Sequence, residues 1–233
     1  MKHSFIFVLL ICFSWQARAQ CSFIIKGSFV LRDGRQLSGS LHLAFPTAQV
    51  ASALHYYDGK QEREFTPDLM RNCILGKHTF IVARNFVAPD DHGGISVDQD
   101  FVEVVDTTGS VQLFSYSYEA YIDPSWTGGA PVMMSSGLMG GSMSKAGGYA
   151  KRRIMVLRKA GSQQFVPYTA GEKRLLLKLN NDEGPTETDV ASTVAFFSND
   201  PALQDLILKG KLPSSQLLTA VRAHNSGAKK PTH

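Results

Sequence analysis

Residues 23–45 read FIIKGSFVLRDGRQLSGSLHLAF, and their alternation decides the fold. Apolar residues and glycines occupy odd positions on both sides of Arg32-Asp33-Gly34. A period of two is typical of strands with one buried face. A three-residue turn pairs residues whose numbers sum to 66, which keeps every odd position on that face. The sequence therefore predicts a hairpin with Gly34 as a left-handed bulge. Gly27 then faces Gly39, which leaves room for an aromatic ring.

Three more antiparallel pairs are predicted downstream. They are 52–57 with 60–65 around a two-residue Asp58-Gly59 turn, 72–75 with 79–86 around Gly76-Lys77, and 101–105 with 110–118 around 106–109. The acidic segment 87–97 is predicted to be a loop. Short strands at this spacing favour an antiparallel β sandwich or small barrel within 20–122.

Composition divides the rest of the chain. Seven glycines and four methionines fall within 123–150, which predicts a flexible loop. Residues 151–168 are predicted to supply strands that complete the β domain. Capping residues and a period near 3.6 within 186–227 predict three short helices packed on the sheet. The expected class is therefore mainly β with a small α part (α+β).

The first 19 residues have the order of a secretory signal peptide. Lys2 precedes nine apolar residues, and a small-x-small motif ends at Ala19, so we expect cleavage between Ala19 and Gln20. The expected location is exported, in the periplasm or outside the cell. Cleavage leaves 214 residues and lowers the net charge from +4 to +2.

The charge and hydropathy patterns bear on partners. A nearly neutral chain with interspersed charges has no nucleic-acid footprint. No segment after the leader approaches the ~18 unbroken apolar residues of a spanning helix, so no transmembrane segment is expected in the mature chain. The expected partner is an unknown envelope component or protein.

Two cysteines remain after cleavage, Cys21 and Cys73. An oxidising compartment favours a Cys21–Cys73 disulfide, which would contribute roughly 4 kcal/mol on a loop-entropy argument. Two alternatives stay open. Cys21 is a lipidation candidate, although Gln20 is not the small residue that a lipobox requires, and both thiols could also be buried and unpaired.

Metal and catalytic candidates are weak. Asp90, Asp91, Asp98 and Asp100 could gather around calcium together with His92, but their spacing matches no EF-hand. Ser142 and Lys145 satisfy S-x-x-K, yet they lie in the glycine-rich loop and lack the accompanying motifs. The other histidines lie far apart in the sequence and lack the spacing of a zinc helix, and His42 falls on the polar face of its strand. No catalytic residue and no cofactor is predicted.

Several stretches resemble a group of uncharacterised secreted proteins from Bacteroidota bacteria. They include Leu31-x-x-Gly34-x-x-Leu37-x-Gly39-x-Leu41, FTPDL at 65–69, FVEVVD at 101–106, Gly109-Ser110-Val111-Gln112-Leu113-Phe114-x-Tyr116, LRK at 157–159 and Asp200-Pro201-x-Leu203. The resemblance covers most of 27–225 and implies a bacterial envelope setting. That group has no established activity, so it assigns no site residue.

These observations favour a secreted envelope protein that acts as a non-enzymatic binding or structural module. The alternative is a periplasmic hydrolase whose site assembles from His92, Asp98 and a Ser or Cys nucleophile. Calcium-dependent adhesion through 90–100 is a third possibility.

Overall fold

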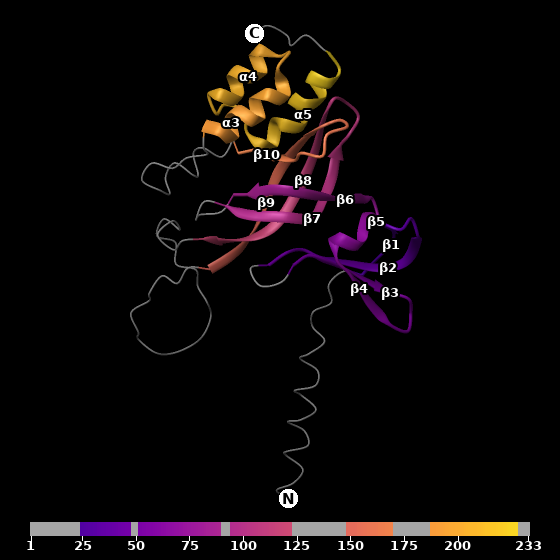
Figure 1. Ribbon diagram of the computed structural model, residues 1–233. Coiled ribbons are helices and arrows are strands. Elements are labelled where there is room, and N and C mark those ends of the chain that lie inside the picture. The colour runs from indigo at the N-terminus through magenta and orange to yellow at the C-terminus, as the bar shows by residue number, and fades with distance from the viewer. Residues whose placement is uncertain (1–23, 48–50, 90–93, 123–147, 170–186, 228–233) are drawn as a thin grey trace, which may run out of the picture.

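The computed structural model describes residues 24–47, 51–89, 94–122, 148–169 and 187–227. Ten antiparallel strands form one sheet, and helices follow them in the chain (Figure 1). The strands are β1 (Ile25–Leu31), β2 (Gln36–Ala44), β3 (Ala53–Tyr57), β4 (Glu62–Phe65), β5 (Met70–Leu75), β6 (His78–Ala88), β7 (Ile95–Asp106), β8 (Val111–Ile122), β9 (Gly148–Lys159) and β10 (Val166–Pro167). The helices are α3 (Glu187–Val194), α4 (Pro201–Leu208) and α5 (Ser214–Asn225), with 3-10 turns η1 (Pro67–Leu69) and η4 (Ala195–Phe197).

The sheet is open, and this corrects the expectation of a sandwich or closed barrel. Its strand order is β10-β9-β8-β7-β6-β5-β1-β2-β3-β4, so among the described strands β10 and β4 are edges that do not pair with each other. The sheet curls without closing. Its curvature is evident from the contact between β10 and β6, which are not neighbours in the strand order. A twisted sheet of ten strands can curl so that its apolar side chains pack against one another, while its two edge strands remain unpaired.

The first hairpin has the predicted register. Phe29 pairs with Leu37 and Gly27 with Gly39, and Gly34 adopts a φ of 91° in the turn. The ring of Tyr56 lies over Gly39, where an added Cβ would approach it to 2.6 Å. The bare glycine patch therefore accommodates an aromatic ring from β3, as the sequence predicted.

The second hairpin pairs the predicted strands, but its turn is displaced. Leu54 lies opposite Phe65, and Asp58 donates its backbone N–H to the carbonyl of Gln61. The turn is therefore centred on Gly59 and Lys60 instead of Asp58 and Gly59. Gly59 takes a φ of 90°, a conformation that its lack of a Cβ permits. Each residue of β3 therefore pairs with a residue two positions further along β4 than predicted. Because two is an even number, every side chain stays on its predicted face.

The strands β6 and β7 extend beyond the predicted bounds of 79–86 and 101–105, and they pair with each other. Ala88 pairs with Ile95, so both ends of the segment expected to be a loop at 87–97, residues 87–88 and 95–97, belong to strands. Asn85 has a φ of 52°, and the buried positions on each side of it fall out of step. This local twist interrupts the alternation that identifies a strand. Similarly, β9 begins at Gly148, inside the predicted 123–150 loop, because β8 continues far enough to pair with it.

The two faces of the sheet bury different regions. On one face, β1–β5 enclose a core with Phe29, Leu41 and Leu54, and β8–β9 support the helices. On the opposite face, β6–β9 enclose a second core around Phe86 and Phe114. The face of β2–β4 opposite Leu41 and Leu54 remains partly exposed and polar.

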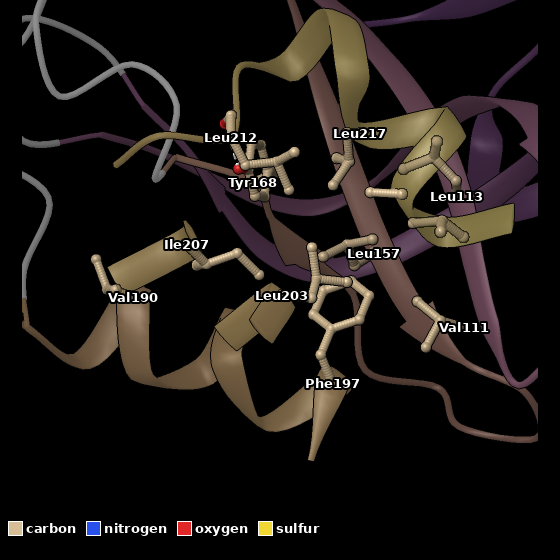
Figure 2. Close-up of a cluster of buried hydrophobic side chains, with 12 residues drawn as sticks. Val111, Leu113, Leu157, Tyr168, Val190, Phe197, Leu203, Ile207, Leu212 and Leu217 are labelled. Carbon is tan, nitrogen blue, oxygen red and sulfur yellow. Dashed lines mark hydrogen bonds between the residues drawn. The ribbon is translucent and has the colours of Figure 1, made fainter. Parts of the chain in front are cut away.

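The helices cover the end of β8 and β9 and lie apart from β1–β4 (Figure 1). Leu203 and Ile207 of α4 and Leu217 of α5 point toward Leu113 and Leu157 of the strands (Figure 2). All five side chains are fully buried. At roughly 1.5–3 kcal/mol for each buried apolar side chain, this contact is sufficient to hold short helices that would be marginal alone.

Polar contacts fix α5 against the turn between β7 and β8. Arg222 Nε donates to Asp106 Oδ2 over 2.6 Å. The side-chain amide of Asn225 accepts from Val111 N over 3.0 Å and donates to Val111 O over 2.8 Å, as a neighbouring strand would. An added Cβ on Gly109 would fall 2.0 Å from Asn225 Cγ, so this close approach requires glycine.

Several predicted features lie outside the described residues. They are the leader at 1–19 with its cleavage site between Ala19 and Gln20, the segment 123–147, and residue 186 at the start of the predicted helical part. None of the described helices has the length and apolar character needed to cross a bilayer.

We predict that Asp106→Asn destabilises the protein in a pH-dependent manner. The Arg222 guanidinium and the Thr108 hydroxyl and amide lower the pKa of Asp106 from 3.8 to about 2. Because the folded-state pKa is depressed, the stabilisation is complete above about pH 4 and is lost as the pH falls toward 2. Arg222 is 62% exposed, so after allowance for screening we expect a loss of about 1–2 kcal/mol at pH 7.

Urea unfolding of wild type and Asp106→Asn at pH 7 and near pH 2 measures this contribution. The difference between the two free energies of unfolding should shrink at the lower pH. A difference that stays constant with pH would show that the ion pair does not act through ionisation of Asp106.

Candidate functional site

The carboxylates proposed for calcium do not form one site in the described part of the chain. Asp98 is exposed, whereas Asp100 is buried, with 4% of its surface accessible. Asp90, Asp91 and His92 lie outside the described residues. Among the described residues, no three or more His, Cys, Asp or Glu side chains lie close enough together to hold a metal ion.

Asp100 is a buried hydrogen-bond acceptor. Its Oδ2 accepts from the Tyr116 hydroxyl over 2.8 Å, and its Oδ1 accepts from Phe101 N over 2.6 Å. Burial raises the pKa of Asp100, and the hydroxyls of Ser52 and Tyr116 with the amide of Phe101 oppose that rise. Ser52 Oγ is itself buried without a well-aligned hydrogen bond to any described residue, so it lies near the carboxyl in poor alignment. Asp100 therefore organises the interior between β7 and β8.

Cys73 is fully buried on β5, opposite Phe29 of β1. Burial raises the pKa of its thiol to about 12, so the reactive thiolate is scarce at neutral pH. Cys21 lies outside the described residues, and the disulfide with Cys73 stays a prediction. β1 begins at Ile25, about 13 Å along the strand from the level of Cys73, so the chain before Ile25 would have to turn back to form the bridge.

The hydrolase alternative gains no assembled centre from the described residues. Asp98 faces solvent, and the burial of Cys73 opposes a nucleophilic role. His92, Ser142 and Lys145 lie outside the described residues.

A surface network joins His78 of β6, Glu103 of β7 and Arg153 of β9. His78 Nδ1 lies 2.5 Å from Glu103 Oε1, and Arg153 Nη2 donates to Glu103 Oε2 over 2.7 Å. Arg153 Nε also donates to Ser115 Oγ over 2.5 Å. The partner of His78 Nδ1 is therefore the Glu103 carboxylate, and the serine oxygen accepts from Arg153. This network ties three strands together.

The outer face of β2–β4 brings histidine, tyrosine and glutamate side chains together. We use that name for the surface carrying His42, His55, Tyr57, Glu62 and Glu64. The strand register places His42 opposite His55 and His55 opposite Glu64, in one row across three strands. Tyr57 and Glu62 are paired in the next row. The side chains project away from the core because Leu43, Leu54 and Tyr56 occupy the alternate positions.

Hydrogen bonds order this face. His55 Nδ1 lies 2.8 Å from Glu62 Oε1, and the Tyr57 hydroxyl donates to the same oxygen over 3.0 Å. The rings of His42 and His55 stack with centroids 5.6 Å apart and planes inclined by 27°. Partial burial lowers the pKa of His42, and His55 lowers it further. Burial and Glu62 raise the pKa of Tyr57. The arrangement therefore offers a neutral imidazole, an oriented imidazole and carboxylates to a ligand.

Sequence reasoning missed this cluster for a definite reason. His42 and His55 are 13 positions apart and belong to different predicted hairpins. Their proximity depends on the pairing of β2 with β3, whose register no short turn fixes. The sequence did contain one signal. Each histidine alternates with apolar residues that face the core, which places both histidines on the outer side of their strands.

Comparisons with known proteins do not assign a role to this surface. No protein-family model matches the chain, and no curated protein or solved structure matches it.

We predict that the stability of Asp100→Asn, relative to that of wild type, increases as the pH rises. The folded-state pKa is raised, so the native protein binds more protons than the unfolded chain above pH 3.8. Wild-type stability therefore declines as Asp100 is forced to ionise, whereas asparagine carries no such penalty.

Urea unfolding between pH 4 and pH 7 measures the difference between Asp100→Asn and wild type. This difference should move in favour of the variant with increasing pH. Asp106→Asn provides the control, because the pKa of that carboxyl is lowered and its pH dependence has the opposite sign. A flat Asp100→Asn difference would contradict the assigned burial effect.

Proposed function

We propose that this is an exported bacterial envelope protein that acts as a binding or structural module, with the outer face of β2–β4 as its contact surface. The observation that carries the proposal is the cluster of His42, His55, Tyr57 and Glu62 on a sheet whose opposite face is packed with apolar side chains. A rigid support of this kind presents polar groups in fixed positions, which favours recognition.

The leader and the resemblance to secreted Bacteroidota proteins support an envelope setting. The distribution of other polar groups supports a binding role. Asp100 is held by Tyr116 in the interior, and Asp106 is held by Arg222 at the helices. Each carboxylate therefore has a hydrogen-bond partner within the fold. The outer face of β2–β4 has no comparable duty in the core.

We predict export with cleavage after Ala19. Mass spectrometry of the protein from an envelope fraction should give a mature chain that begins at Gln20. Soluble cytosolic protein that retains Met1 would contradict the proposal. A diacylglycerol adduct on Cys21 would instead show that the mature chain begins one residue later, as a lipoprotein.

We predict that a double substitution on the face, Tyr57→Ala with Glu62→Gln, removes partner binding. The chain, expressed in full and processed by its host, is cross-linked in envelope extract, and the captured species are quantified by mass spectrometry. A partner of the face should be retained by wild type and reduced at least about tenfold by the double variant, the loss expected for removing an anchor worth more than 1.4 kcal/mol.

Lys209→Ala is the matched control, because Lys209 forms an exposed pair with Asp205 at the helical end. It should retain the partner at the wild-type level. Equal capture by wild type and the double variant would overturn the assignment of the face. Labelling of wild type by a serine- or cysteine-directed probe, with loss of labelling in His92→Ala, would favour the hydrolase.

A further inference from the structure

His42 and His55 have the spacing of two imidazoles that share one metal ion. Zinc–nitrogen bonds are about 2.0–2.1 Å long, so two imidazoles on one tetrahedral ion have ring centres about 5 Å apart. The observed ring centroids are 5.6 Å apart. The two residues are directly paired across β2 and β3, where opposite Cβ atoms lie about 4.5–5.5 Å apart. Rotation of the His42 ring can therefore bring one of its nitrogens toward His55 Nε2 without movement of the backbone.

Glu62 prepares His55 for this role. It accepts at Nδ1 over 2.8 Å, which leaves the lone pair of the neutral ring on Nε2. A carboxylate behind a ligating histidine fixes the ring and increases its basicity. The Tyr57 hydroxyl donates to the same carboxylate oxygen and holds it in place. His55 thus has the oriented arrangement of a metal ligand before any metal binds.

The charge around the pair also suits a cation. Glu64 is exposed and lies directly opposite His55 on the far side from His42. Arg63 occupies the alternate position, and its guanidinium lies 3.6 Å from Asp58. The two carboxylates on the outer face of β2–β4 are therefore placed to attract a cation to the imidazoles.

We propose that His42 and His55 chelate one divalent transition-metal ion of the zinc–copper class, with Glu62 as the positioning residue. Imidazole nitrogen suits both ions, and hard ions such as calcium prefer sites built from oxygen. Water completes the coordination shell, because two protein ligands leave positions open. This inference rests on the proposed function, since it names the ligand chemistry of the same face.

Metal titration of the whole processed chain tests the proposal. Zn²⁺ binding is measured by isothermal calorimetry, and Cu²⁺ binding by electron paramagnetic resonance, which detects coordinated nitrogen directly. We expect one ion per chain, a nitrogen signature in the Cu²⁺ spectrum, and an increase in Tm on addition of Zn²⁺. Calcium should produce none of these effects.

Variants separate ligation from folding. His42→Phe and His55→Phe keep a flat ring on the strand but supply no nitrogen, so each should abolish the nitrogen signature and the Zn²⁺-dependent rise in Tm. Glu62→Gln should weaken affinity by about 10- to 100-fold, the usual effect of losing an outer carboxylate.

His78→Ala is the matched control. His78 also faces a carboxylate at Nδ1, that of Glu103, but it lies at the start of β6, outside the His42–His55 pair. Its removal should leave metal binding unchanged. Wild-type protein that binds neither ion would overturn the proposal, as would binding that persists in both phenylalanine variants.

Partner capture in the presence of a chelator separates this inference from the proposed function. The metal site alone is overturned if no metal binds under any condition, while a partner binds wild type but not the double variant Tyr57→Ala with Glu62→Gln (the face variant). Metal binding at the histidines with equal partner capture by the face variant overturns the proposed contact surface alone.

Discussion

The register of the antiparallel pairs β1–β2 and β2–β3 is the constraint on which the candidate site depends. Side chains alternate between the faces of a strand, so the positions that bury Leu41, Leu43 and Leu54 also direct His42 and His55 outward. A slip of one residue would bury both imidazoles and expose the leucines. Apolar packing on one face therefore specifies the polar constellation on the other.

The two structurally committed aspartates show how different environments use the same carboxyl group. Asp106 faces Arg222 at the edge of the helical cap, where a nearby cation favours the charged form. Asp100 lies in the interior, where its nearest partners are a phenol and a backbone amide and burial favours the neutral form. One couples the helices to the sheet, and the other joins neighbouring strands. Neither shift in pKa requires a catalytic explanation.

The sequence predicted the parts of the fold that short turns control. The first hairpin was predicted down to its register because a three-residue turn alone preserved parity. Parity also placed the second hairpin's faces correctly, although Asp58-Gly59 was mistaken for the centre of its turn. It failed at Asn85, where a positive φ breaks the alternation within a long strand. It could not predict the pairing of β2 with β3, or the open sheet, because these depend on long-range packing.

The edge of the sheet explains why carboxylates and histidines occur together on this face. β4 is an edge strand, and exposed edges invite unwanted pairing unless charge opposes it. Glu62, Arg63 and Glu64 provide that charge in three consecutive positions. Alternation sends the two glutamates to the side that carries the histidines and Arg63 to the other. Protection of the edge thus produces a negative surface beside His55, and one of the protecting carboxylates also orients its ring. Aggregation resistance and ligand recognition therefore place the same requirement on these positions.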